Sequence, residues 1–185
     1  MFAPGIPGRH FMQAAFIVDD VEAAARRWVA CTGVGPFLLV PHIELAEYSY
    51  RGERRASSDS GGLDFSVALA QSGGVQIELV QQHCDSPSAY RDTIARGAQG
   101  FHHLAIYCDD YDAAHAHYRD KGFIAAVDGM FGPLRFSYFD TSGAIGCMIE
   151  LVEEHASQSE FFARIAEAAA GWDGVTDPLR PGFPA

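Results

Sequence analysis

Long apolar runs, paired cysteines and positive charge are all scarce in this sequence. No run of about 18 apolar residues is present, so we expect no membrane-spanning helix. The first ten residues, MFAPGIPGRH, are too few and too rich in Gly and Pro for the apolar core of a secretory signal peptide. The four cysteines form no CxxC pair. We therefore expect a cytoplasmic protein with free thiols.

The scarcity of positive charge narrows the class of partner. The chain has 13 Lys and Arg residues against 24 Asp and Glu residues, for a net charge of −11. Phosphates would be repelled by such a surface, so we expect no nucleic-acid partner. A small-molecule substrate is favoured instead. An anionic substrate stays possible, because Arg51, Arg54 and Arg55 form a local basic cluster.

The sequence contains an internal repeat. Residues 13–20, QAAFIVDD, align with residues 103–110, HLAIYCDD, and each segment predicts a short apolar strand that ends in two Asp residues. An Ala-rich segment follows each Asp pair and ends at Gly33 or Gly122. Asp is a favoured helix N-cap and Gly a favoured terminator, so each copy is predicted to continue from its strand into a helix.

The later part of each copy also matches. VQIELVQ surrounds Glu78 and CMIELVE surrounds Glu150, and a strand with a Ser-Gly turn precedes each one. Gln13 and His103 are 90 positions apart, whereas Glu78 and Glu150 are 72 apart, so the first copy is 90 − 72 = 18 residues longer. The excess falls within residues 42–62, which we interpret as an extended hairpin or a flexible loop.

These patterns predict one α+β domain over residues 1–185, built from two tandem βαβββ modules. A linker helix capped by Ser86 is expected between the modules, and a helix over residues 156–170 is expected before an irregular tail. The predicted segments are module 1 at about 10–82, the linker helix at about 86–97, module 2 at about 100–154, and the C-terminal helix and tail at about 156–185.

Four polar residues interrupt apolar strands at equivalent positions of the repeat: Gln13, Glu78, His103 and Glu150. Strand alternation places His103 on one face with Phe101, and His102 on the other. A lone Glu near a strand end is commonly a solvated edge residue, and a lone His is commonly structural. The equivalence of all four favours a shared polar site, because a carboxylate in such a strand is costly to bury unless it is paired or binds a metal.

The segment GFHHLAIYCDD, the linker DSPSAYRDTIARGAQG and the two IELV endings resemble the glyoxalase/bleomycin-resistance/dioxygenase superfamily, also called vicinal oxygen chelate proteins. The resemblance extends over about residues 10–154 and is strongest to the methylmalonyl-CoA epimerase and glyoxalase I-like branch. It implies a cupped mixed sheet with flanking helices, surrounding a divalent metal ion.

The same resemblance implies that Gln13, Glu78, His103 and Glu150 are the metal ligands. Epimerases have His at the position of Gln13, and the set found here looks like that of some glyoxalase I enzymes. Oxygen-rich donors with one imidazole suit Zn, Ni, Co, Mn or Mg. Ring-cleaving dioxygenases use two His and one carboxylate, which makes that activity the less favoured alternative. The second catalytic Glu of epimerases falls on or near Ser66 here.

The implied function is that of a metal-dependent lyase or isomerase, with Glu150 or Glu78 as the base that removes a proton from a substrate with adjacent oxygens. The alternative is a protein that binds or sequesters a small molecule without a metal. We also expect a homodimer in which residues 156–185 add to the interface.

Overall fold

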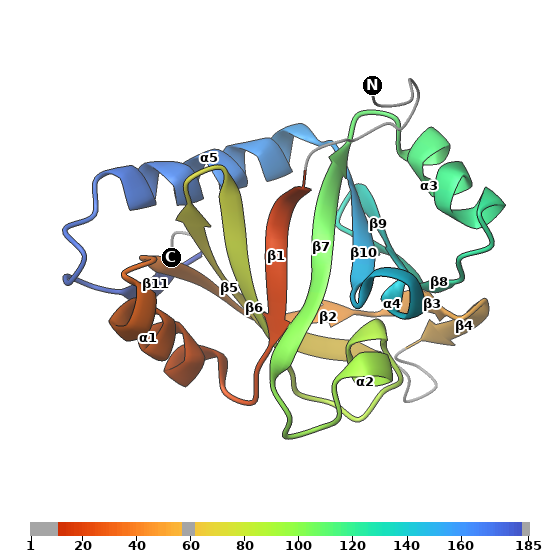
Figure 1. Cartoon of the computed structure of the whole chain (residues 1–185), viewed down its shortest axis with the longest axis horizontal. Helices are drawn as coiled ribbons and strands as arrows, with labels where there is room; N and C mark the ends of the chain where they lie inside the picture. Colours follow the sequence, from red (N-terminus) through yellow and green to blue (C-terminus); the bar gives the residue numbers. More distant parts are fainter. Residues whose placement is uncertain (1–10, 57–61, 183–185) are drawn as a thin grey trace.

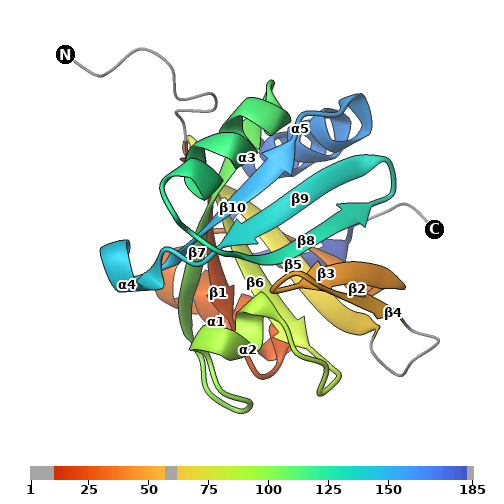
Figure 2. The same ribbon diagram turned by 90° about the vertical axis from the view of Figure 1, so that its right-hand side faces the viewer.

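The computed structural model describes residues 11–56 and 62–182. All described strands belong to one mixed sheet of eleven strands, which curves into a cup with the two crossover helices against its outer side (Figures 1 and 2). The strand order is β11-β2-β5-β6-β1-β7-β10-β9-β8-β3-β4. The predicted α+β fold with a cupped mixed sheet is therefore confirmed.

The two repeats have the same topology. The first comprises β1 (Phe11–Ile17), α1 (Val21–Thr32), β2 (Phe37–Leu45), β5 (Leu63–Ser72) and β6 (Val75–Gln82). The second comprises β7 (Gly100–Cys108), α3 (Tyr111–Asp120), β8 (Ala125–Phe131), β9 (Leu134–Phe139) and β10 (Met148–Glu153). Each repeat starts with an inner strand, crosses over through its helix, and returns so that its last strand pairs in parallel with its first.

The repeats meet at the antiparallel pair of β1 and β7 in the middle of the sheet (Figure 1). Gln13 pairs with Ala105, and Ala15 pairs with His103. This reciprocal register relates the two modules by a pseudo-twofold axis between the strands. Positions that are equivalent in the repeat therefore lie on opposite sides of one axis and close to it.

The crossover helices begin as the Asp pairs predict. Asp20 Oδ1 accepts a hydrogen bond from the backbone N of Ala23 at 2.9 Å, and Asp110 Oδ1 accepts one from Ala113 at 3.0 Å. α1 ends at Gly33, whose φ of 73° suits a residue without a Cβ. α1 packs on β5 and β6, and α3 packs on β9 and β10, so both helices cover the convex side and leave the concave side for the site.

The insertion of the first repeat joins the sheet of the second. β3 (Glu47–Tyr50) and β4 (Glu53–Ala56) form a hairpin, and β3 pairs with β8 of the second repeat (Figure 2). Residues 57–61 of the insertion lie outside the described residues. The part of the insertion that the structure describes is thus an ordered hairpin that lengthens the far edge of the sheet.

The linker helix differs from its prediction. α2 (Ala89–Thr93) is shorter than expected and is capped by Ser88, whose Oγ accepts from the backbone N of Arg91 at 3.1 Å. Ser86 instead donates its hydroxyl to the carbonyl of Gly62 at 2.7 Å. The first of the two Ser residues is held by the loop opposite, so the cap shifts to the second.

The C-terminal extension folds back on its own chain. α5 (Ala156–Ala170) lies along the open side of the first module, and β11 (Leu179–Pro181) adds a parallel strand beside β2 (Figure 1). A short helix, α4 (Ser142–Ile145), separates β9 from β10. The described part of this extension covers the cup of its own chain, and the expected dimer stays a prediction.

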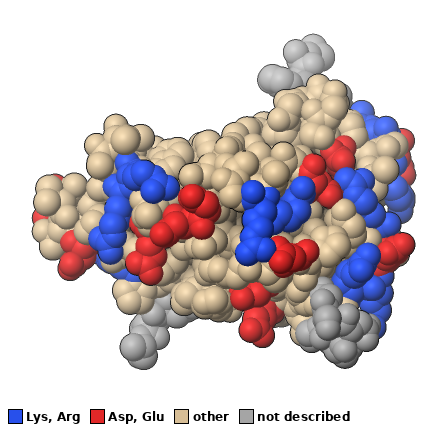
Figure 3. All heavy atoms as spheres, turned by 90° about the horizontal axis from the view of Figure 1, so that it is seen from below, with Lys and Arg blue, Asp and Glu red and all other residues tan. Residues whose placement is uncertain are grey.

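Three sequence expectations concern the surface charge, the cysteines and membrane-spanning helices. On the face shown in Figure 3, basic and acidic side chains lie beside one another, without one large basic patch. All four cysteines are free thiols. No helix in the described part of the chain has the length and apolarity needed to cross a membrane.

Candidate metal centre in an apolar cup

The concave face of the sheet forms a cup that opens to solvent, with a cavity volume of about 190 Å³. Alternation along β5 turns Phe65, Val67 and Leu69 into the cup, and β9 adds Phe136 and Tyr138. Ser66, the position where the resemblance suggests a second base, faces the opposite side of the sheet. β5 therefore presents three apolar side chains to the cup and no acid or base.

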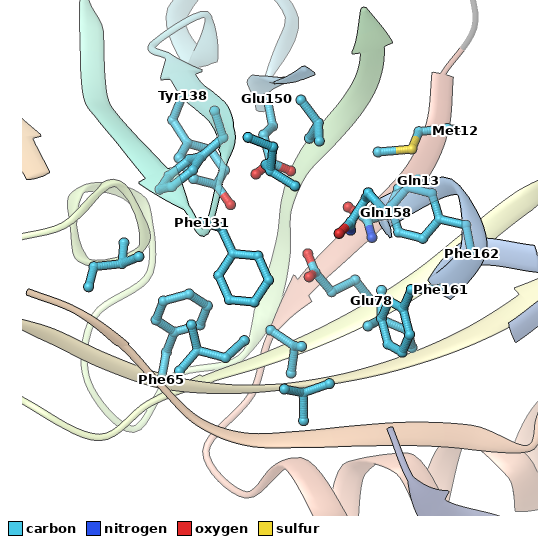
Figure 4. A pocket seen from close by; sticks show the side chains of 18 of the residues that line it. Met12, Gln13, Phe65, Glu78, Phe131, Tyr138, Glu150, Gln158, Phe161 and Phe162 are labelled. Atoms are coloured by element: carbon cyan, nitrogen blue, oxygen red, sulfur yellow. The ribbon is translucent and has the colours of Figure 1, made fainter. Parts of the chain in front are cut away.

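Three of the four predicted ligands meet inside the cup. His103 Nε2 lies 3.4 Å from Glu78 Oε2 and 3.2 Å from Glu150 Oε2, and the three donor atoms all lie within 4.8 Å of one another. His103 is fully buried, and the side chains of Glu78 and Glu150 are 13% and 11% exposed. Figure 4 shows both carboxylates pointing into the same space from opposite walls.

The register explains why the two glutamates converge. Glu78 pairs with Ala15 on β1, two residues beyond Gln13, and Glu150 pairs with Ala105 on β7, two residues beyond His103. The same offset occurs on both sides of the pseudo-twofold axis. The internal repeat in the sequence thus becomes a pair of carboxylates at one centre.

Gln13 occupies the fourth equivalent position, and it too lines the cup. Its side chain is buried, and Nε2 donates to Gln76 Oε1 at 3.4 Å. This hydrogen bond engages the amide nitrogen and leaves the carbonyl oxygen of Gln13 as its coordinating atom.

His102 departs from its predicted orientation. The pairing of β1 with β7 shifts register between Ala15 and Phe16, which marks a bulge at residues 101–103. His102 and His103 are consequently both buried, and their Nδ1 atoms are 2.8 Å apart. Phe101 instead turns to the convex side and contacts Phe16 at a ring distance of 5.4 Å. Strict alternation put Phe101 with His103, and the bulge makes that assignment wrong.

The contact between the two histidines fixes the tautomer of His103. His102 Nε2 lies 2.9 Å from the carbonyl oxygen of Ala89, so this nitrogen carries a proton and donates it. Burial, with the charge of His103, lowers the pKa of His102 to about 3, which keeps its ring neutral and its Nδ1 unprotonated. His103 Nδ1–H must therefore donate to His102. With a metal ion in place of the proton, a neutral His103 would direct the lone pair of Nε2 toward the space between the two carboxylates.

The electrostatics favour a positive charge between the carboxylates. Burial alone would lower the pKa of His103, but Glu150 and Glu78 outweigh it and raise the pKa to about 9. Burial raises the pKa of Glu78, and His103 partly offsets this while Glu150 adds to it. The negative charge of the pair is thus stabilised when a cation lies beside it.

Two tyrosines form the wall behind His103. The hydroxyl oxygens of Tyr90 and Tyr138 are 3.2 Å apart, and the Tyr138 ring meets the His103 ring edge-on at 5.0 Å. Burial raises the pKa of each phenol well above its usual value, so both stay protonated. Tyr90 was not predicted as a site residue. Its position in the linker between the modules is the sequence feature that could have indicated it.

The donor set fits a divalent metal ion. Among the described residues, His103 Nε2 is a fully buried ring nitrogen that makes no well-aligned hydrogen bond, although the two carboxylates lie within 3.4 Å of it. Such an atom is costly to bury unless something binds it. An imidazole nitrogen held by a second hydrogen-bonded group, with two carboxylates at its free side, is the usual arrangement of a protein metal ligand.

Comparison with known proteins agrees with this architecture. The profile of the Glyoxalase/Bleomycin resistance protein/Dioxygenase superfamily matches residues 12–138. The chain belongs to this superfamily. The match includes both inner strands and ends in β9, so it spans three of the four ligand positions. A comparison with curated proteins finds no significant match.

Solved structures with the same fold include methylmalonyl-CoA epimerase from Mycobacterium tuberculosis. It is 18% identical, with a TM-score of 0.54, and the match covers 86% of this chain and 97% of that one. A hypothetical protein from Bacillus halodurans is 15% identical, with a TM-score of 0.53 and coverage of 79% and 94%. At these identities the likeness is one of fold, and activity must be argued from the site.

Proposed function

We propose that this protein is a metal-dependent lyase or isomerase that removes a proton beside a carbonyl group of a small substrate. The observation that carries the proposal is the buried Nε2 of His103, between the carboxylates of Glu78 and Glu150. A divalent ion held by these residues and by Gln13 would polarise adjacent substrate oxygens and stabilise an enolate. Membership of the superfamily supports this reading.

The protein residues would divide the remaining work. Glu150 is the proposed base, and Glu78, at the equivalent place in the other module, lies on the opposite wall. His102 would hold the ring of His103 in place, and the phenols of Tyr90 and Tyr138 exclude water behind it.

The lining of the cup defines the class of substrate. Among the described residues that line it, no side chain is Lys, Arg or His, and apolar groups predominate. Arg51, from the basic cluster noted in the sequence, is engaged by Asp92 at 2.7 Å and by Asp140 at 3.2 Å. The two carboxylates would balance the charge of a divalent ion, and no Lys or Arg among these residues adds a positive charge to hold an anionic group. We therefore propose an uncharged substrate with an apolar body.

Helix α5 completes the cup on the side of the first module. Phe161 and Phe162 line the cup from this helix, together with Ser157 and Gln158 (Figure 4). Aromatic rings provide apolar contact, and Gln158 provides an amide for a polar end of the ligand. The C-terminal extension thus supports selection of a hydrophobic molecule.

Metal content and proton exchange together test the proposal. Protein incubated separately with Zn, Ni, Co, Mn and Mg, then dialysed, is expected to retain metal in the cup, and the Glu78→Gln/Glu150→Gln variant is expected to lose it. Uncharged α-hydroxy ketones incubated in D2O are expected to exchange the proton beside the carbonyl, as followed by NMR.

The matched control is Glu153→Gln, on the same strand. Glu153 is bound by Arg135 at 2.7 Å outside the cup, so exchange should continue in this variant. A wild-type protein that retains no metal in the cup and exchanges no proton, yet binds the ketones, would overturn the proposal. A small-molecule binding protein would then be the better description.

A further inference from the structure

The convex side of the first module carries a second group of side chains that could hold a metal ion, on the other face of the sheet from the cup. His42, Asp64 and His83 each offer a donor atom, and these atoms lie within 4.8 Å of one another. The three residues come from the β2 bulge, from β5 and from the residue after β6. None of them lines the cup, because the sheet separates the two groups of side chains.

The backbone directs His42 toward its neighbours. The pairing of β2 with β5 shifts register between Val40 and Ile43, and His42 in this bulge has a φ of 49°. A residue with a Cβ seldom adopts this left-handed conformation, and such outliers concentrate at binding sites. The outcome is that His42 Nδ1 lies 3.1 Å from both carboxylate oxygens of Asp64.

His83 is oriented by a buried hydroxyl. Ser66 Oγ lies 2.7 Å from His83 Nε2 and accepts the backbone N–H of His42 at 3.0 Å. With Nε2 engaged by Ser66, Nδ1 is the free nitrogen of His83. The two imidazole rings stack at 4.5 Å, with an angle of 27° between their planes. A hydrogen bond to the remote ring nitrogen is the support that metal-binding histidines usually have.

Burial excludes a nucleophilic role for the same residues. A Ser beside a His resembles the start of a hydrolytic site, but Ser66 is only 3% exposed. Its oxygen already contacts two nitrogens, so a substrate carbonyl has no access to it. The exposed side of the cluster is His42, whose side chain is 65% exposed, and this side is open to an ion from solvent.

We propose that His42, Asp64 and His83 form a second divalent-metal site on the convex face. Two ligands on one ion with bonds of about 2.0–2.2 Å lie roughly 3 Å apart, as His42 and Asp64 do here. Rotation of the exposed His42 ring closes the remaining distance to His83. Two imidazoles and one carboxylate favour Zn²⁺, Co²⁺, Ni²⁺ or Cu²⁺ over Mg²⁺ or Ca²⁺.

Such an ion would join three strands at one end of the first module. β2, β5 and β6 lie side by side there, and the ion would bridge the bulge to the end of the β5–β6 ladder. A ligand that binds only the folded chain stabilises it. The site therefore predicts metal-dependent thermal stability that is independent of the cup.

The stoichiometry of Zn²⁺ tests the proposal on the full chain. After equilibrium dialysis and elemental analysis, the wild type is expected to hold two equivalents. His42→Asn keeps a residue that tolerates positive φ, and Asp64→Asn keeps the size of the side chain. Each variant is expected to hold one equivalent. Glu78→Gln/Glu150→Gln is also expected to hold one, now at the convex site.

The matched control is His115→Asn. His115 Nε2 lies 3.1 Å from Asp128 Oδ1, the same His–Asp spacing, but this pair belongs to no three-ligand group among the described residues. The control should keep both equivalents. In the Glu78→Gln/Glu150→Gln protein, Zn²⁺ should raise the unfolding midpoint, and adding His42→Asn should abolish that shift.

The possible failures are distinguishable. If the wild type holds one equivalent that only Glu78→Gln/Glu150→Gln removes, the convex site is wrong and the metal centre in the cup stands. If one equivalent is held and only His42→Asn and Asp64→Asn remove it, the convex site stands and the cup proposal fails. If His42→Asn and Asp64→Asn each keep the wild-type content, the convex site is refuted.

Discussion

The two modules have one topology and one register but supply different chemistry. Each brings a glutamate to the centre at the same offset from its inner strand. At the other equivalent position the first module supplies the amide of Gln13, and the second supplies the imidazole of His103, which His102 supports. Symmetry of the fold thus sets the positions of the donors, while substitution at one position gives the two carboxylates unequal surroundings.

The rims of the modules differ as well. α5 covers the first module, and the β3–β4 hairpin lengthens the sheet of the second (Figure 1). Both additions come from segments outside the repeat. The repeated core therefore supplies the candidate metal ligands, and α5, from outside the repeat, adds side chains to the lining of the cup.

The largest expected effect separates the roles of the two glutamates. Glu150→Gln keeps a coordinating oxygen but cannot accept a proton, so turnover should fall by about 10²–10⁴-fold. Metal content, measured on the same sample, should stay near that of the wild type. If Glu150→Gln keeps the wild-type rate and Glu78→Gln loses it, the base belongs to the first module instead.

The second prediction concerns helix α5, which covers the first module. Ile165 of α5 is fully buried, and Ile165→Ala should lower the free energy of unfolding by about 2–5 kcal/mol. Denaturant titration measures the loss. Glu167→Ala, on the exposed side of the same helix, is the control and should change it by less than about 0.5 kcal/mol. Equal, small losses in both variants would mean that α5 contributes little to the folded domain.

The third prediction concerns the contact of His102 with His103, which belongs to the second module. His102→Phe removes the acceptor of His103 Nδ1–H, and metal affinity should fall by about 10–100-fold. Isothermal titration with Zn²⁺ measures the affinity. Both proteins compared carry Asp64→Asn, so that binding at the proposed convex site does not add to the signal from the cup. An unchanged affinity would show that His103 is oriented by its packing and not by His102.

Sequence patterns predicted the features that the two modules share and missed the features in which the structure departs from the repeat. The paired Asp caps and the IELV strands locate both modules, and Glu78, His103 and Glu150 are brought together in the structure. The bulge at His102 was missed, because alternation in one strand does not show how its partner strand pairs with it. The pairing of β3 with β8 and of β11 with β2 was missed for a similar reason, since edge pairings depend on contacts far apart in sequence.

The smallest expected effect tests where the modules should behave alike. Asp20 caps α1 and Asp110 caps α3 with nearly equal hydrogen bonds of 2.9 and 3.0 Å. Replacing an Asp cap by Ala typically costs about 1 kcal/mol, because the first backbone N–H groups lose their acceptor. Asp20→Ala and Asp110→Ala should therefore lower the free energy of unfolding by similar amounts. Asp19→Ala is the control, since the exposed carboxylate of Asp19 forms its one ion pair within residues 11–56 and 62–182 with Arg27, at 3.8 Å, and should contribute less. A clearly larger loss at one cap would show that the modules contribute unequally to stability even where their local structure is the same.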